Sequence, residues 1–299
     1  MHDRRQKPIV VALVTGVVVL LAGGLVIALH ESPAESAPTT SAPVPTEEAP
    51  SVPAAPAPAA PAGPVVDGTV HDLTGLPPVD VFAIVPELSI EPATDVPPGP
   101  EVVTPVSAAV PVFGAPGSAP VAQLLAQQVH DGTTVPVVEQ SEHWLRVLLP
   151  ARAGYPSEGV VGQTTGWVRR ADVTTAVAPF LVTVSLAGSI TIVENGTVVH
   201  ASDAFGYGTA QTPTPLGGTF IMTTFTDPAA GYTRGLPIVA LGVQSPTLDG
   251  FGGTDVAVTA FHYHDVRADA VSNGCLRVDE ATILRLAALP LGTPVLITA

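Results

Sequence analysis

Residues 180–200, FLVTVSLAGSITIVENGTVVH, decide the fold class of the C-terminal part of the chain. Two β-prone runs, 181–186 and 189–193, flank the turn residues Ala187-Gly188. Asn195-Gly196 follows, and this dipeptide is the strongest short signal for a two-residue hairpin turn. The stretch therefore predicts a β meander.

One helix and one last strand are predicted downstream of the meander. Asp279 is a suitable N-cap, Ile283 and Leu284 contribute an apolar face, and Pro290 ends the helix. Residues 294–297 are expected to form the final strand. We therefore expect a mainly β domain with one short helix.

Short β-prone runs separated by Gly and Pro also fill the preceding segment. They lie at 109–113, 134–139, 143–150 and 166–170. Many short strands with this punctuation predict a small barrel or sandwich. Their order, with a central Trp144 strand and a closing Trp167 strand, resembles bacterial Src-homology-3-like domains. We expect a small β-barrel module over 104–178, with both tryptophans in its core.

The first thirty residues predict where the protein resides. Basic residues precede an uncharged run of 22 residues at 8–29, which would span roughly 33 Å as a helix, close to the hydrocarbon thickness of a bilayer. The positive-inside rule places Met1 in the cytoplasm and the chain after His30 outside. We expect a single-pass cell-membrane protein whose folded part lies in the extracytoplasmic space.

A spacer is predicted after the apolar run. Residues 31–64 contain ten prolines and no aromatic residue, so they cannot bury enough apolar surface to offset their ordering entropy. Residues 65–100 hold one β-prone run among prolines and are expected to be mostly irregular. The expected parts are a cytoplasmic tail (1–7), a transmembrane anchor (8–29), a Pro/Ala-rich linker (30–103), a β module (104–178) and a C-terminal domain (179–299).

Net charge and cysteine content narrow the function. A net charge of −15 at pH 7 argues against nucleic-acid binding, which needs clustered Lys and Arg. Cys275 is the one cysteine. Extracytoplasmic proteins usually pair their cysteines, so a single thiol is either a reactive group or a buried structural residue.

The neighbours of Cys275 supply what a reactive thiol needs. A thiol becomes a nucleophile as a thiolate and requires a nearby base, and His262 and His264 lie thirteen and eleven positions upstream. Ser-Asn-Gly at 272–274 suits a tight turn whose backbone N–H groups converge, as in an oxyanion hole. From these residues alone, a Cys–His acyl-transfer site and a structural thiol carry about equal weight.

Two blocks resemble the L,D-transpeptidase catalytic domain family, also called YkuD. The first, His262 to Arg277, is similar to the family's pattern of a His, a loop, and Ser-His-Gly-Cys followed by a hydrophobic residue and Arg or Asn. The second, GTAQTPTPLGGTF at 208–220, is similar to the family's G-T-x-x-T-P-T-P-x-G-x-F/Y segment. The resemblance covers 180–299 and implies an L,D-transpeptidase-type β-sandwich with one short helix.

The resemblance also implies roles for individual residues. Cys275 is expected to be the nucleophile and His262 its base, with the backbone carbonyl of Tyr263 orienting the imidazole. The expected oxyanion-hole amides are those of Asn273, Gly274 and Cys275. The residues expected to hold the loop and the substrate are Ser272, His264 and Arg277.

The implied reaction joins peptidoglycan stem peptides. A donor tetrapeptide would acylate Cys275 and expel its terminal D-alanine, and an acceptor amine would resolve the thioester. Water as the acceptor would give a carboxypeptidase side activity. The resemblance implies no metal and no cofactor, and it implies that carbapenem-type β-lactams are covalent inhibitors.

Two departures from the family's pattern leave alternatives open. Asn273 stands where the family usually has His, and the loop between His262 and Cys275 is shorter than the common length. His264 therefore remains a rival base. The alternative function is a catalytically silent, peptidoglycan-binding envelope protein that keeps the fold. A metal pair of His262 and His264 is not expected, because no further ligand at a suitable spacing completes a site.

Overall fold

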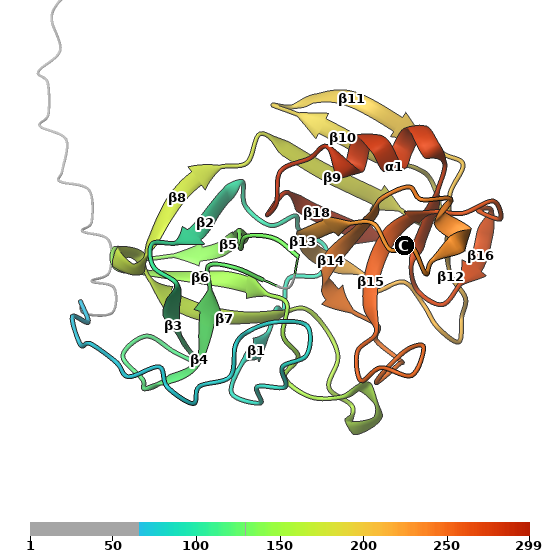
Figure 1. Ribbon diagram of the computed structural model, residues 1–299. Helices are drawn as coiled ribbons and strands as arrows, with labels where there is room; N and C mark the ends of the chain where they lie inside the picture. The colour runs from blue at the N-terminus through green and yellow to red at the C-terminus, as the bar shows by residue number, and fades with distance from the viewer. Residues whose placement is uncertain (1–65, 129) are drawn as a thin grey trace, which may run out of the picture. The chain divides into compact units, whose positions relative to one another are not determined.

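The computed structural model describes residues 66–128 and 130–299. This part of the chain is mainly β, with 18 strands, one α-helix and three short 3-10 helices (Figure 1), as the sequence predicts. The predicted tail, the anchor at 8–29 and the spacer at 31–64 lie outside the described residues. Among the residues that are described, no helix is both long and apolar enough to cross a membrane.

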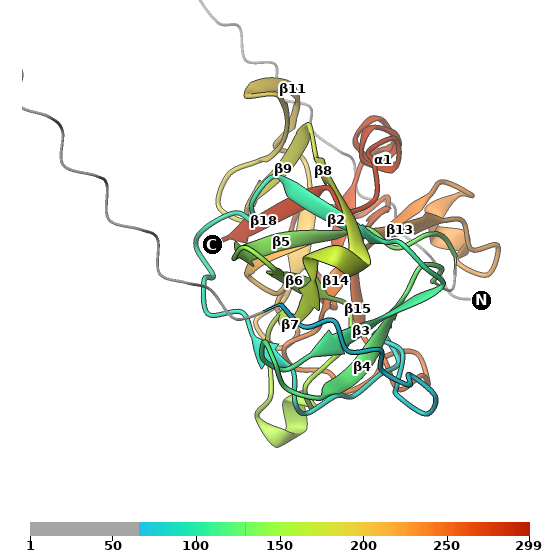
Figure 2. The same ribbon diagram turned by 90° about the vertical axis from the view of Figure 1, so that its left-hand side faces the viewer.

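The first sheet runs from Ser89 to Val177, so it begins within the stretch that the sequence assigns to the linker. Its order is β4-β3-β7-β6-β5-β2-β8, and β1 pairs with β7. Its strands are β1 (Ser89–Ile90), β2 (Glu101–Pro105), β3 (Ala109–Phe113), β4 (Pro120–Leu125), β5 (Val135–Gln140), β6 (Trp144–Leu149), β7 (Thr164–Arg169) and β8 (Val173–Val177). These strands curl around an apolar interior (Figure 2). The four predicted runs are therefore strands, with ends displaced by at most two residues; the likeness to Src-homology-3 domains stays a prediction.

Two buried aromatic side chains of the first sheet form a pair of their own, separate from its main apolar cluster. Phe113 and Trp144 are fully buried and meet edge to face, with ring centroids 5.0 Å apart. Trp167 is only partly buried. Trp144 thus serves as core, as predicted, whereas Trp167 lies nearer the surface.

Residues 66–103, which the sequence assigns to the linker, fold onto the first sheet. They are largely irregular, yet Val79, Val85 and Leu88 are buried in its apolar core. Their backbone groups bond to the module: the Val85 amide donates to the Arg152 carbonyl at 2.8 Å. Residues 66–103 contain β1 and the first three residues of β2, and long-range hydrogen bonds of this kind let the rest of this proline-rich segment become buried without regular strands.

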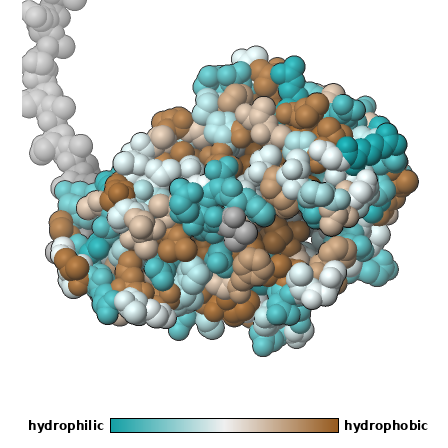
Figure 3. Space-filling view, viewed as in Figure 1, coloured by the Kyte–Doolittle hydropathy of each residue, from teal (hydrophilic) through white to brown (hydrophobic). Residues whose placement is uncertain are grey.

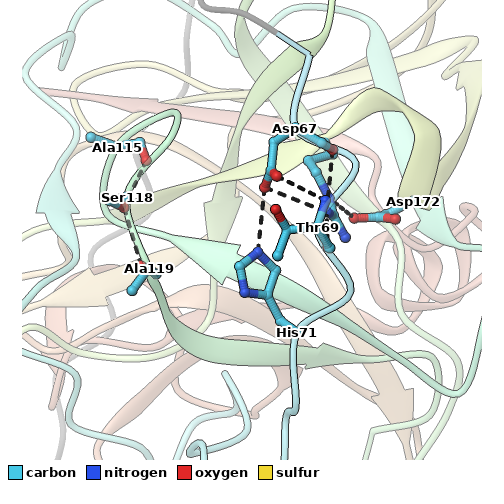
Figure 4. Close-up of polar contacts among 8 residues, drawn as sticks. Asp67, Thr69, His71, Ala115, Ser118, Ala119 and Asp172 are labelled. Carbon is cyan, nitrogen blue, oxygen red and sulfur yellow. Dashed lines mark hydrogen bonds and ion pairs between the residues drawn. The ribbon is translucent and has the colours of Figure 1, made fainter.

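The first described residues are tied to the end of β7 by an ionic cluster (Figure 4). Arg169 reaches the Asp67 carboxylate at 3.4 Å, the Asp172 carboxylate at 2.6 Å and the Thr69 carbonyl at 2.7 Å. His71 lies 3.3 Å from the same Asp67 carboxylate. Hydrogen bonds from Thr69, aided by His71 and Arg169, lower the pKa of Asp67 from 3.8 to about 2. The Asp67 carboxylate therefore stays ionised well into acid.

The second sheet contains the remaining strands in the order β11-β10-β9-β18-β13-β14-β15-β17-β12-β16. They are β9 (Phe180–Ser185), β10 (Ile190–Glu194), β11 (Thr197–Ser202), β12 (Gly206–Gly208), β13 (Gly217–Phe225), β14 (Ile238–Gln244), β15 (Val258–Tyr263), β16 (Asp269–Ser272), β17 (Leu276–Val278) and β18 (Pro294–Thr298). Three pairings are parallel, namely β18 with β9, β15 with β17, and β12 with β16. The helix α1 (Glu280–Ala287) packs against β14 and β15.

The local signals in the sequence act as predicted in this sheet. Asn195 and Gly196 have φ of 46° and 84° and connect β10 to β11, because a hairpin turn of this hand needs two positive φ angles. The Asp279 carboxylate accepts a hydrogen bond from the Thr282 amide at 2.8 Å and caps α1. Ile283 and Leu286 of α1 are fully buried in the core of the second sheet, whereas Leu284, which the sequence assigns to the apolar face, is 48% exposed.

Candidate active site

The parallel pairing of β15 with β17 brings the two halves of the predicted site together. Phe261 lies opposite Leu276 in this register, and His262 lies opposite Arg277. Cys275 directly precedes β17, so its backbone lies beside the end of β15 that carries His262. Cys275 and His262 both line one pocket of about 300 Å³. The face in Figure 3 is hollowed in this region and largely apolar around the hollow.

The His262 imidazole is held by its own strand. The residue exposes only 7% of its surface, and Nδ1 lies 2.9 Å from the backbone carbonyl oxygen of Tyr263, the contact that the resemblance implies. A carbonyl oxygen only accepts, so Nδ1 carries the proton and Nε2 presents a lone pair. The Tyr232 ring stands edge-on to the imidazole at a centroid distance of 5.0 Å. These contacts select the tautomer that can accept a proton from a thiol.

Burial sets the protonation states of both groups. Desolvation lowers the pKa of His262 below its ordinary 6.5, and the nearby Arg277 adds to this effect. Desolvation also raises the pKa of the Cys275 thiol above its ordinary 9.0, which the Ala260 backbone amide and Arg277 only partly offset. At neutral pH the resting pair is therefore a neutral imidazole and a neutral thiol.

A pH dependence follows from these two shifts. Acyl transfer requires neutral His262, so its rate is expected to hold at pH 6.5 and to fall at lower pH, where the imidazole becomes protonated. Alkylation by iodoacetamide requires the thiolate and is expected to keep rising above pH 9.0. Intact-mass measurements on quenched samples give both rates. An alkylation rate that levels off well below pH 9.0 would indicate a thiolate–imidazolium pair instead.

His264, the rival base, lies outside this pocket. Its Nδ1 accepts a hydrogen bond from the Val266 amide at 2.9 Å, which engages the ring with its own loop. Its ring centroid is 6.2 Å from that of His262. Of the two histidines, His262 alone lines the pocket that contains Cys275. The geometry therefore favours His262 as the base.

Ser272 and Gly274 build the turn that precedes Cys275. The Ser272 hydroxyl donates to the Cys275 carbonyl oxygen at 2.6 Å and accepts from the Gly274 amide at 3.1 Å. Gly274 has a φ of 114°, in the region that favours glycine. Of the three amides expected at the oxyanion hole, that of Gly274 is thus already bonded to Ser272. The amides of Asn273 and Cys275 remain as candidates, and the Asn273 side chain is exposed.

The T-P-T-P block holds this turn from the other side. The Thr214 hydroxyl donates to the Gly274 carbonyl oxygen at 2.8 Å and accepts from the Gly208 amide at 2.9 Å. The Thr212 hydroxyl donates to the Ser272 carbonyl oxygen at 3.2 Å. A Cβ at Gly208 would clash with the Thr212 carbonyl, so this close approach requires glycine. The threonine hydroxyls of this block therefore hold the turn by its backbone carbonyl groups.

Arg277 places a cation beside the Cys–His pair. Its Nη1 donates to the Val266 carbonyl at 3.3 Å. Its Nε is buried and has no hydrogen-bond partner among the residues described. An unpaired buried N–H group is unfavourable, and a guanidinium pairs best with an anion. This Nε is closed to a ligand in the structure, so the expected contact of Arg277 with a substrate carboxylate stays a prediction.

The loop between β14 and β15, residues 245–257, forms another wall of the pocket through Phe251 and Val256. This loop is held by the buried Arg152, which precedes β7 in the first sheet. Arg152 donates to the carbonyl oxygens of Ser245, Leu248 and Asp249 at 3.4, 2.8 and 2.5 Å. The module therefore fixes part of the wall of the candidate site.

Replacing Arg152 by methionine is expected to loosen this loop. Methionine has a similar reach but no donor, and a hydrogen bond to a charged group is worth about 1.5–3 kcal/mol. We expect a loss of about 2 kcal/mol or more in the free energy of unfolding, measured by urea denaturation, and faster amide exchange over 245–257. Arg152→Lys keeps the charge and should lose less. Unchanged exchange in the loop of Arg152→Met would contradict this role.

Several residues of the pocket carry no signal in the sequence. Tyr232 lies in a short 3-10 helix, Thr223 and Phe225 lie on β13, and Phe82 and His130 come from the region of the first sheet. None belongs to a motif with fixed spacing to Cys275. Long-range packing alone brings these residues to the site, so a search for sequence motifs does not find them.

Comparison with known proteins shows that the segment containing the candidate site matches a protein family. Residues 179–297 match the model of the YkuD family, the L,D-transpeptidase catalytic domain. No match was found among curated proteins.

Similar solved structures include three structures of L,D-transpeptidases. One from Mycobacterium smegmatis has 13% identity over 52% of this chain and 91% of that chain, with a TM-score of 0.31. L,D-transpeptidase 1 from Mycobacterium tuberculosis has 19% identity over 46% and 78%, with a TM-score of 0.28. A third, in complex with imipenem, has 15% identity over 52% and 91%, with a TM-score of 0.32. The functional argument rests on the family match: the segment that holds His262 and Cys275 is similar to L,D-transpeptidase catalytic domains.

Proposed function

We propose that the protein is a cysteine-dependent L,D-transpeptidase that crosslinks peptidoglycan stem peptides. One observation carries the proposal: Cys275 and His262 share a pocket. They do so inside a segment that matches the L,D-transpeptidase catalytic domain. A lone thiol beside an imidazole of fixed tautomer is the pair that acyl transfer through a thioester requires.

The proposed acylation step forms the thioester. Nε2 of His262 takes the thiol proton while Sγ of Cys275 attacks the carbonyl carbon of the L-centre residue of the donor stem. The tetrahedral intermediate then collapses and the C–N bond to the terminal D-alanine breaks. The imidazolium gives its proton to the leaving amine, so His262 acts first as base and then as acid.

The proposed second step transfers the acyl group. An acceptor amine attacks the thioester carbonyl, and its excess proton passes to His262. The C–S bond breaks and the thiolate recovers that proton, which restores the resting neutral pair. Water in place of the amine yields a free carboxylate, the L,D-carboxypeptidase side reaction.

Two features of the site support this sequence of steps. The amides of Asn273 and Cys275 lie in the turn beside the nucleophile, and one oxyanion-hole donor contributes about 3–4 kcal/mol to such a transition state. The Arg277 cation acts electrostatically on both His262 and Cys275, and its charge would attract the carboxylate of the departing D-alanine.

The proposal includes a location. The apolar run at 8–29 would anchor the chain in the cell membrane, with the catalytic part in the cell-wall space where stem peptides lie. A reporter enzyme that is active only outside the cytoplasm, fused after Ala299, should be active. An inactive reporter on a stable fusion protein would place the catalytic part in the cytoplasm.

The decisive experiment is covalent labelling of the full chain in detergent. Wild type and Cys275→Ala are incubated with a carbapenem, and intact masses are recorded. A single adduct on wild type alone is expected. In parallel, a tetrapeptide stem with an amine acceptor should release D-alanine and form a joined product.

The opposite outcome supports the alternative function. If a folded wild-type protein takes no adduct, turns over no stem and still binds isolated sacculi, the protein is a silent peptidoglycan-binding protein. Asn273→His would then be the next variant, because Asn273 departs from the family's pattern.

A further inference from the structure

The chain contains two asparagines, Asn195 and Asn273, and a glycine follows each of them. The side-chain amide of an asparagine can react with the backbone nitrogen of the next residue, and a glycine leaves this approach open because it has no side chain. Both asparagines are exposed, and both glycines have a positive φ, 84° for Gly196 and 114° for Gly274. The two pairs therefore offer the same chemistry in two settings.

The two settings differ in how the glycine is held. Gly196 is exposed in the turn between β10 and β11. Gly274 is buried, and its amide donates to the Ser272 hydroxyl at 3.1 Å. The Asn273 side chain, by contrast, has no hydrogen-bond partner among the residues that the structure describes. At this second pair the electrophilic side chain is therefore free, while the nucleophilic nitrogen is restrained.

The reaction at Asn273 needs no reagent other than water. The Gly274 nitrogen loses its proton and attacks Cγ of Asn273, so that a new C–N bond forms. The side-chain nitrogen takes up a proton and leaves as ammonia. Water then opens the five-membered imide at one of its two carbonyl groups. One product is aspartate, and the other is isoaspartate, in which the backbone runs through the former side chain.

Isoaspartate would lengthen the backbone between two fixed points. The Ser272 carbonyl oxygen accepts a hydrogen bond from the Thr212 hydroxyl at 3.2 Å. The Gly274 carbonyl oxygen accepts one from the Thr214 hydroxyl at 2.8 Å. One additional C–C bond of about 1.5 Å between these carbonyls has to displace either a threonine contact or Cys275. A displacement of about 1 Å at a reacting group can lower the rate a hundredfold.

Either product also places a negative charge beside the nucleophile. The side chain of Asn273 is neutral, whereas aspartate and isoaspartate both carry a carboxylate. Burial already raises the pKa of the Cys275 thiol, and an anion two residues away raises this pKa further. Less thiolate would then form at neutral pH, so the charge and the displaced backbone act in the same direction.

We propose that Asn273 is a site of spontaneous deamidation, that its conversion switches off Cys275, and that the Ser272 hydroxyl sets the rate by holding the Gly274 nitrogen. The amide is lost as ammonia, so the chain does not return to its starting form and the active form has a limited lifetime. The inference goes beyond the proposed function, because conversion is measured without any turnover.

The test is an ageing experiment on the full chain in detergent. The protein is incubated at mildly alkaline pH, and samples are digested with pepsin in acid, where no further deamidation occurs. Peptide mapping by mass spectrometry follows conversion at Asn195 and at Asn273. The same samples are assayed for release of D-alanine from a tetrapeptide stem and for alkylation of Cys275 by iodoacetamide. We expect both rates to fall in proportion to conversion at Asn273 and to be independent of conversion at Asn195.

Variants separate the two pairs. Ser272→Ala frees the Gly274 amide and should speed conversion of Asn273 about threefold or more. Conversion of Asn195 should not change in this variant, whereas general unfolding would speed both. Asn273→Gln moves the amide one methylene away from the backbone and should hold its starting rates throughout the incubation. Asn195→Gln is the matched control and should lose its rates as fast as wild type.

The outcomes separate the inference from the proposed function. Rates that fall with conversion of Asn195, or with neither asparagine, would overturn the inference. The same holds if Asn273 stays intact in wild type and in Ser272→Ala while Asn195 converts. Conversion of Asn273 that slows alkylation, in a protein that turns over no stem, would keep the inference and reject the proposed function.

Discussion

Replacing His262 by alanine is expected to lower kcat/KM for acyl transfer by about a hundred- to ten-thousandfold, the range that general acid–base groups contribute. The reason lies in the resting state of the pair. Burial keeps Cys275 protonated at neutral pH, so little thiolate forms without a base. His262 is the histidine placed to take that proton within the same pocket. Release of D-alanine from a tetrapeptide stem measures the effect.

His264→Ala is the matched control for this variant. His264 lies outside the pocket, and its Nδ1 is engaged by the Val266 amide. We expect its removal to change kcat/KM by less than about threefold. If His264→Ala instead lost activity while His262→Ala kept it, and circular dichroism showed both variants folded, His264 would be the base.

Thr214→Val is expected to reduce both stability and kcat although Thr214 is remote from the reacting atoms. Valine has nearly the same shape but leaves the Gly208 amide and the Gly274 carbonyl without their partner. Each unsatisfied buried group costs about 1–3 kcal/mol. The freed turn would also shift Cys275, and a displacement of about 1 Å at a reacting group can cost a hundredfold in rate. Thermal unfolding and steady-state kinetics measure the two effects.

The kinetic pattern identifies Thr214 as a positioning residue. We expect kcat to fall more than KM changes, because the turn carries the nucleophile and not the binding pocket. Thr214→Ser restores the hydroxyl and should recover most of the rate. A serine variant as slow as the valine variant would show that the hydroxyl is not what holds the turn.

Local signals in the sequence were sufficient to predict four strands of the module, the meander with its hairpin, the last strand and the helix start, but not β4, β13 or β14. Asn195-Gly196 fixes its turn through positive φ angles, and Asp279 caps its helix through its own side chain. Each depends on neighbours within a few residues. The pairing of His262 with Cys275 in one pocket was predicted through the resemblance, not through geometry.

Long-range pairing is what the sequence does not reveal. The parallel strands β15 and β17 bring His262 opposite Arg277, and no local pattern specifies that register. The bond between Ser272 and the Gly274 amide removes one of the three amides expected at the oxyanion hole. Residues 66–103 look like linker by composition, yet Val79 and Val85 are buried because distant backbone groups bond to the segment.

The tie between Asp67 and Arg169 has a mechanical consequence. Tension applied to the chain from its N-terminal side reaches Asp67 and Thr69 first and passes through Arg169 into β7. This strand lies inside the first sheet, between β3 and β6. Because Asp67 stays ionised down to about pH 2, the attachment persists in acid. A pull from the N-terminal side therefore reaches the first sheet before it reaches the strands that align Cys275 with His262.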